Sequence, residues 1–171
     1  MIINGTILSQ IVPPVLTPMS IHKMRPQGHQ TSWGRGEAGY DIRIKQDIVF
    51  FINEEGPQIA ITDPILRQTT YKKGRFCLAS SVERFEMPQH LVGIGHDKST
   101  LARLGVQVFN TVIEPGWEGY LTIELVFNDE DRVHIPAGSG IMQVLFHQLA
   151  EPAQYVGKYQ DQPDAPVAAK A

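Results

Sequence analysis

The chain has little of what several large protein classes require. Cys77 is its single cysteine, so an intramolecular disulfide and a cysteine cage for zinc are both excluded. No run of residues approaches the roughly 18 apolar positions of a membrane-spanning helix. Charged residues make up only 19% of the chain, and its net charge of −3 gives no basis for non-specific attraction to nucleic acid. We therefore expect a cytoplasmic protein that binds neither membranes nor nucleic acid.

Proline and glycine, in contrast, are plentiful. With 12 prolines and 15 glycines in 171 residues, the chain is expected to have many turns and few long helices. Its length suits one domain with one hydrophobic core. Short alternating segments separated by turn residues are typical of a β barrel or a β sandwich. Strands are predicted over residues 39–44, 48–52, 58–62, 74–81, 82–88, 106–112, 120–127, 133–136 and 141–149, and a short helix over 7–11.

Residues 17–39 are polar and irregular, and the sequence assigns them no single role. A surface loop, a loop that covers a ligand and an arm that binds a partner all fit this composition. Just after this segment, Asp41 and Arg43 share one face of a predicted strand. We expect them to form a cross-strand or surface ion pair of little energetic value, rather than a catalytic pair.

The segment from residue 96 to 127 concentrates candidate functional side chains. If residues 98–104 form one or two helical turns, Ser99 and Arg103 stand four residues apart on one face, with a hydroxyl and a guanidinium pointing together. Alternatively, Ser99 only caps the helix and Arg103 is a surface charge. Gly105 is expected to end the helix, because glycine tolerates the left-handed conformation found there.

Glu124 lies in the strand predicted over residues 120–127. This strand alternates strictly, so Glu124 shares a face with Val126 and opposes the apolar side chains of the other face. If that face is open to water, Glu124 is simply a solvated carboxylate. If the face closes over a pocket, apolar neighbours would raise its pKa and make it a useful general base.

Several catalytic signatures are missing from the sequence. It contains no GxxxxGK[ST] phosphate loop, no GxGxxG after a strand and no GxSxG nucleophile turn. The H-x-E…P-C-x-x-C signature of zinc nucleobase deaminases is also missing, and one cysteine could not supply it. Any hydrolytic chemistry is therefore expected to proceed without a protein-bound zinc.

Four ordered segments carry a resemblance to a known family. The segments KSTLARLG, TVIEPGWEGYLTIEL, PAGSGIMQVLF and GKYQDQ resemble the dCTP deaminase family, which belongs to the superfamily that also contains the trimeric dUTPases. FCLASSVERFEMP and GYDIRI also look like family strands. The resemblance is strong from about residue 76 to residue 162.

The resemblance implies a fold, an activity and an assembly. The fold would be mainly β, a distorted jelly-roll-like β barrel with a few short helices. Residues 1–155 would form a single nucleotide-binding catalytic domain, and residues 156–171 a mobile tail that closes over the triphosphate. The activity would be hydrolysis of dCTP to dUTP and ammonia by a homotrimer with its sites between subunits. Mg²⁺ would be held through the substrate phosphates rather than by protein ligands, zinc would play no part, and dTTP is a candidate feedback inhibitor.

The same resemblance implies roles for individual residues. Glu124 would be the general base, with Ser99 and Arg103 organising the catalytic water and contacting phosphate. The other positions would bind substrate: Lys98 at a phosphate, the backbone around Thr111 and Val112 at the pyrimidine edge, Glu114 before the Pro-Gly turn, and Tyr155, Lys158 and Gln162 over the triphosphate.

Two positions depart from the family pattern, and three other functions stay open. Asp97 stands where a small residue is common, and Val112 stands where Ala or Pro is expected beside the catalytic water, so its extra methyl groups would crowd that water. The open alternatives are a bifunctional enzyme that converts dCTP to dUMP, a dUTPase alone, and a non-catalytic regulatory nucleotide-binding protein on the same fold.

Overall fold

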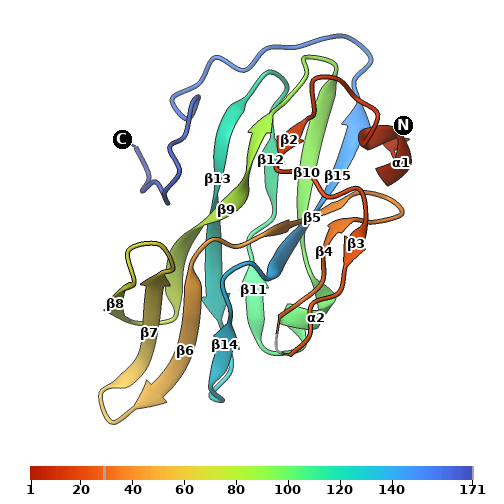
Figure 1. Ribbon diagram of the computed structural model, residues 1–171. Helices are drawn as coiled ribbons and strands as arrows, with labels where there is room; N and C mark the ends of the chain where they lie inside the picture. The colour runs from red at the N-terminus through yellow and green to blue at the C-terminus, as the bar shows by residue number, and fades with distance from the viewer. Residues whose placement is uncertain (29, 171) are drawn as a thin grey trace.

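The computed structural model describes residues 1–28 and 30–170 and consists mostly of β-strands (Figure 1). Within the described residues the strands form three sheets. One has the order β12-β10-β15-β5-β4-β3 with β1 beside β15, the second is β11-β13-β9-β2, and the third is β14-β6-β7-β8. The elements are β1 (Ile2–Ile3), α1 (Gly5–Leu8), β2 (Leu16–Thr17), β3 (Lys23–Met24), β4 (Trp33–Arg35), β5 (Tyr40–Arg43), β6 (Asp47–Asn53), β7 (Gly56–Asp63), β8 (Gln68–Lys73), β9 (Phe76–Glu86), β10 (Leu91–Asp97), α2 (Ser99–Ala102), β11 (Val106–Val108), β12 (Thr111–Ile113), β13 (Glu118–Phe127), β14 (Val133–Ile135) and β15 (Gly140–Gln148).

The core lies between the sheets, and the alternating strands supply it. On β13, Leu121, Ile123 and Leu125 are buried, while the residues between them face the other side. β9 runs antiparallel beside β13 and adds Cys77 to the same core. Burial raises the pKa of the Cys77 thiol to about 12, as expected for a structural cysteine. These features confirm the mainly β, jelly-roll-like fold.

The sequence prediction missed six of the described strands: β1, β2, β3 and β4, which are only two or three residues long, and the longer β8 and β10. β10 escaped notice because it contains Gly93 and Gly95, and glycine inside a strand weakens its pattern. In the fold these glycines allow close packing, since a Cβ at Gly95 would lie 2.5 Å from the sulfur of Met142. β8 was missed because every one of its residues is exposed, which leaves no apolar alternation to read.

The prediction of one continuous strand over residues 106–112 is wrong. It is two strands that belong to different sheets, β11 beside β13 and β12 beside β10. The chain changes sheets at Phe109 and Asn110, where the Asn110 side chain accepts a hydrogen bond from the backbone N–H of Asp97 (3.1 Å). The two predicted strands over 74–81 and 82–88, conversely, are one long strand, β9.

The segment 17–39 contributes strands to the largest sheet. β3 pairs with β4, and β4 pairs with β5. The expected surface pair of Asp41 and Arg43 does not form: Arg43 instead donates to the buried carboxylate of Glu83, with 2.7 Å between Nε and Oε1. Asp41 is itself 1% exposed and pairs with lysine side chains. The prediction failed because the tertiary fold gives each of the two residues another charged partner.

Candidate active site

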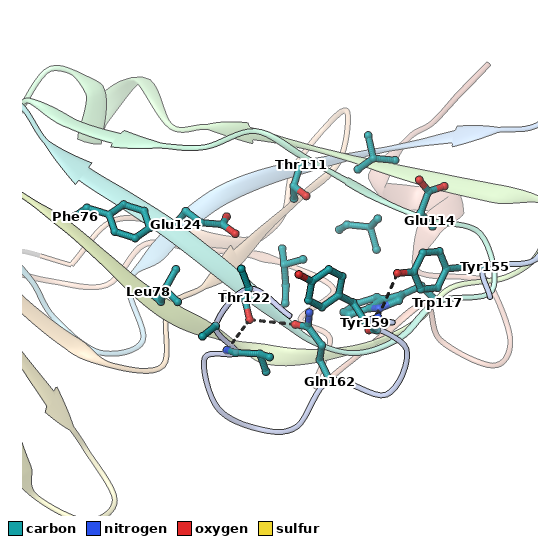
Figure 2. A pocket seen from close by; sticks show the side chains of 16 residues that line it. Phe76, Leu78, Thr111, Glu114, Trp117, Thr122, Glu124, Tyr155, Tyr159 and Gln162 are labelled. Carbon is teal, nitrogen blue, oxygen red and sulfur yellow. Dashed lines mark hydrogen bonds between the residues drawn. The ribbon is translucent and has the colours of Figure 1, made fainter. Parts of the chain in front are cut away.

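A cavity of about 570 Å³ lies on the outer face of β13, opposite the core (Figure 2). The first residues of β9, β12, the turn after β12 and the C-terminal tail form its other walls. Its lining contains six of the predicted site residues: Thr111, Val112, Glu114, Glu124, Tyr155 and Gln162.

Glu124 is one of two carboxylates that line this cavity, and it lies toward the end opposite Glu114 (Figure 2). Figure 2 shows its side chain lying between Thr111 and Leu78, with Phe76 beside it. Leu78 is its cross-strand partner on β9. Partial burial among these side chains raises the pKa of Glu124, because water stabilises the charged form less well there. A raised pKa of this kind is one of the features expected of a general base.

The turn from Glu114 to Glu118 joins β12 to β13 and forms one end of the cavity. Gly116 has φ +71°, a conformation that glycine adopts without strain, and this reverses the chain tightly. Trp117 is buried beneath the turn, and its indole N–H donates to the backbone oxygen of Tyr159 (2.6 Å). The turn thus positions Thr111 and Glu114 on one side of the cavity and binds the tail on the other.

The tail is held against β13 by its backbone. The N–H of Asp161 donates to the oxygen of Glu118 (3.0 Å), and the N–H of Tyr120 donates to the oxygen of Gln162 (3.1 Å). Gly119 makes this contact possible, because a Cβ there would lie 2.6 Å from the backbone nitrogen of Gln162. The glycine that closes the PGWEG motif is therefore explained by close approach of the tail.

The side chain of Gln162 also binds the strand that carries Glu124. Thr122 Oγ1 donates to Gln162 Oε1 (3.1 Å) and accepts from the backbone N–H of Val167 (3.0 Å). Farther along, Lys45 forms an ion pair with Asp164 (2.6 Å). The tail thus lies in a closed position, and its opening stays a prediction.

Four predicted site residues lie elsewhere. Lys98 and Ser99 line a second cavity of about 330 Å³ beside α2. Arg103, the C-cap residue of that helix, is exposed and lines neither cavity. Lys158 is also exposed, and its ammonium group binds the backbone oxygen of Lys170. Within one chain, Glu124 therefore lies apart from the groups expected to act with it, which are the hydroxyl of Ser99 and the charged groups of Lys98 and Arg103.

The short helix α2 begins later than predicted and has a different cap. Its N-cap residue is Lys98, so the alternative in which Ser99 caps the helix is wrong. The backbone N–H of Arg103 donates to the oxygen of Ser99 (3.1 Å), which places the two residues one turn apart as the spacing predicted. Gly105 follows with φ +74°, as expected after the end of a helix.

Sequence reasoning overlooked Thr122, Trp117 and Tyr159 in the cavity wall. A signal existed for Thr122, which lies two residues before Glu124 and so shares its face of the strand. Lys23 and Asp41 at the second cavity were overlooked as well, because a contact between β3 and β5 leaves no periodic signal.

Residues 1–28 and 30–170 contain no group of three His, Cys, Asp or Glu side chains that could hold a metal ion. In the same part of the chain, no helix has the length and apolar character to cross a membrane.

Comparison with known proteins identifies the family of this chain. The family described as dCTP deaminase-like matches residues 24–149. The dCTP deaminase of Chlamydia caviae is 36% identical, with 77% of this chain and 76% of that protein covered. The dCTP deaminase of Campylobacter fetus is 38% identical, with 77% of each covered.

Solved structures share the fold. The 2′-deoxycytidine 5′-triphosphate deaminase from Agrobacterium tumefaciens superposes with a TM-score of 0.54 at 16% identity, over 85% of this chain and 46% of that one. A dUTPase from phage phi11 of S. aureus superposes with a TM-score of 0.51 at 14% identity, over 84% and 95%. The family match and the curated relatives, together with this fold, confirm the resemblance: the chain belongs to the dCTP deaminase-like family.

Proposed function

We propose that this protein hydrolyses dCTP to dUTP and ammonia, with Glu124 as the general base. The observation that carries the proposal is the half-buried carboxylate of Glu124, with a raised pKa, inside a cavity walled by the β12 turn and the tail. A solvated surface carboxylate, the simpler interpretation, would show neither the cavity nor the raised pKa. The named dCTP deaminases among its relatives support the choice of substrate.

One carboxylate at this position can carry both protons that the reaction moves. Glu124 takes a proton from water as the water oxygen bonds to C4 of cytosine, and passes it to ring N3. It then takes the proton of the new C4 hydroxyl and gives it to the amino group, which leaves as ammonia while C4 becomes a carbonyl. Acid–base catalysis of this kind typically contributes about 10²–10⁴-fold.

The walls of the cavity suit the rest of the nucleotide. β12 offers the backbone around Thr111 and Val112 for the pyrimidine edge, with Glu114 at the start of the turn. Val112 is 51% exposed in the single chain and lines the cavity, and crowding of the catalytic water by its methyl groups stays a prediction. Tyr155 and Gln162 come from the segment that we propose closes over the triphosphate.

The phosphate-binding and water-positioning groups come from a second copy of the chain in this proposal. Lys98, Ser99 and Arg103 lie outside the cavity that holds Glu124, so a site that needs all four must be assembled between subunits. Phe76 and Phe109, on β9 and beside β12, are 40% and 45% exposed, as expected of apolar side chains that a partner covers. A homotrimer with three shared sites satisfies both observations.

Mg²⁺ fits this site as a companion of the substrate. Mg²⁺ binds through few carboxylates when phosphates and water supply its other ligands. Of the carboxylates at the second cavity, Asp41 is engaged by lysines, which leaves the phosphate oxygens as the main ligands. When bound, the ion would neutralise phosphate charge. The buried thiol of Cys77 supports a cytoplasmic location, and a role for dTTP as inhibitor belongs to the same proposal.

One incubation tests the function. The protein is mixed with dCTP and Mg²⁺, and dUTP, dUMP, ammonia and pyrophosphate are resolved over time. We expect dUTP and ammonia in equal amounts, and slower turnover when dTTP is added. Formation of dUMP and pyrophosphate would favour the bifunctional enzyme, and turnover of dUTP without dCTP would favour a dUTPase. If neither nucleotide is turned over although both bind, the protein is a non-catalytic nucleotide-binding member of the family.

A further inference from the structure

Three neighbouring strands hold Lys23, Gly34 and Asp41 in one row. β3 pairs with β4 at Lys23 and Gly34, and β4 pairs with β5 at Gly34 and Asp41. Neighbouring strands lie about 4.8 Å apart, so the two outer residues are separated by roughly twice that distance. Gly34 carries no side chain in the middle of the row. The side chain of Lys23 spans this separation and forms an ion pair with Asp41 Oδ2.

Asp41 binds a second lysine as well. The ammonium group of Lys98 reaches the same Oδ2 atom from the end of β10. The Asp41 side chain is only 2% exposed, against 11% for Lys98 and 30% for Lys23. Its Oδ1 atom is buried and accepts no hydrogen bond from the described residues. A carboxylate fixed in this way holds both ammonium groups at one wall of the second cavity.

Lys23 determines the sign of the charge at this wall. Asp41 alone would neutralise Lys98, so Lys23 adds one positive charge more than this buried carboxylate balances, and only with Asp97 does the formal charge of the lining sum to zero. Ser99, Thr100 and Gln143 line the same cavity of about 330 Å³ and add hydroxyl and amide donors. The other carboxylate there, Asp97, is exposed, and water and salt screen its charge. Two ammonium groups on one buried carboxylate, with neutral donors around them, suit a phosphate group.

We propose that Lys23 is a second cation, beside Lys98, for the phosphate chain of the substrate, and that Asp41 is the positioning residue for both lysines. This inference rests on the proposed function for its ligand. Lys23 lies one residue before the range 24–149 that carries the family match. The inference also gives a specific role to the segment 17–39, to which the sequence assigned none, because this segment brings one more charge to the phosphate site.

The binding test uses inorganic triphosphate, which contains the phosphate chain without the base. Calorimetry would compare the wild type with Lys23→Met and with the control Arg25→Met. Arg25 lies in the same segment, is exposed and lines neither of these cavities, so the control removes an equal charge. Loss of one charge-assisted hydrogen bond is expected to weaken triphosphate binding about tenfold in Lys23→Met. Arg25→Met should bind like the wild type, and Lys23→Arg should recover most of the affinity.

The kinetic test separates binding from chemistry. In Lys23→Met, KM for dCTP should rise by a similar factor, while kcat changes less than about twofold because the phosphates are remote from C4. Asp41→Asn should show the same rise in KM at retained kcat if it acts by positioning the lysines. Thermal unfolding of each variant would be recorded, and Lys23→Met carries the test alone if Asp41→Asn does not fold.

The results that would overturn the role of Lys23 differ from those that would overturn the proposed dCTP deamination. Equal triphosphate affinity in the wild type and Lys23→Met, or no binding by the wild type, overturns the inference even if dCTP is deaminated. Inhibition of dCTP turnover by triphosphate that is not competitive would place the cluster outside the substrate site and also overturns it. If triphosphate binding depends on Lys23 but dCTP is not turned over, the phosphate site stands and the proposed function fails.

Discussion

Thr122 and Gln162 are joined by a hydrogen bond of 3.1 Å between Oγ1 and Oε1. Thr122 lies two residues before Glu124 on the same face of β13, so the tail is attached to the strand that carries the proposed base. The same hydroxyl accepts a hydrogen bond from Val167. One side chain therefore links the closed position of the tail to the wall of the cavity that contains Glu124.

Replacing the proposed base should remove turnover but not binding. Glu124→Gln keeps the shape of the side chain but cannot accept a proton from water, so kcat is expected to fall by about 10²–10⁴-fold. Calorimetry should show dCTP bound by the variant as by the wild type. Glu118→Gln is the control, since Glu118 lies on the same strand with its carboxylate on Arg84, outside the cavity. Near-normal turnover in Glu124→Gln would show that another group is the base.

The pH profile should report the raised pKa of Glu124. A general base works only when ionised, so activity falls as the pH falls through its pKa. Because burial raises the pKa of Glu124, the acidic limb of kcat/KM is expected at a higher pH than the ordinary glutamate value of about 4.3. Rates measured between about pH 4 and pH 8 would test this. An acidic limb at or below the ordinary value contradicts the assignment.

The raised pKa of Glu124 should also change how the stability of the protein depends on pH. A group whose pKa is raised by folding contributes stability that is fully present below its unfolded pKa and is lost as the pH rises through its folded pKa. Gln cannot ionise and avoids this loss. Glu124→Gln should therefore unfold at a higher temperature than the wild type at about pH 8, and the difference should vanish in acid. A less stable variant at the higher pH would show that the carboxylate makes favourable contacts when charged.

Weakening the contact between Thr122 and the tail should raise KM chiefly. Thr122→Val removes the hydroxyl that binds Gln162 and Val167 but keeps the branched shape. Two hydrogen bonds of about 1 kcal/mol each are lost, so KM for dCTP is expected to rise by up to about 30-fold if the tail closes over substrate. Thr122→Ser keeps the hydroxyl and should resemble the wild type. An unchanged KM in Thr122→Val would separate the tail from substrate binding.

Mixed assemblies should reveal sites shared between subunits. Ser99→Ala and Glu124→Gln are each expected to be inactive, because each removes one half of the proposed site. When the two variants are unfolded and refolded together, about a quarter of the shared sites should receive both intact residues. Activity should then appear in the mixture and not in either parent. Continued inactivity of well-mixed trimers would place Ser99 and Glu124 in the same subunit's site, or outside it.

The strand pattern was readable in the longer strands whose buried face is apolar. β13 and β15 were predicted within two residues of their ends because their apolar residues alternate. The same logic failed for β8, which buries neither face, and for β10, whose glycines hide the pattern while permitting close packing. Residues 106–112 were read as one strand because their composition does not show that the two halves pair with different sheets.

The candidate site, like the fold, was only partly predictable from the sequence. The pattern of residues along the chain was enough to predict the mainly β fold and to place Glu124 on the face of its strand opposite the core. The family resemblance could also be recognised from motifs in the sequence. The folded chain was needed to show that Glu124 is half-buried in a cavity, that the tail lies on β13 beside Gly119, and that Lys98 and Ser99 line a separate cavity. Contacts of this kind join residues that are distant in sequence and leave no periodic trace. The pairing of Lys23 with Asp41 is the clearest case, since it joins the outer two of three neighbouring strands.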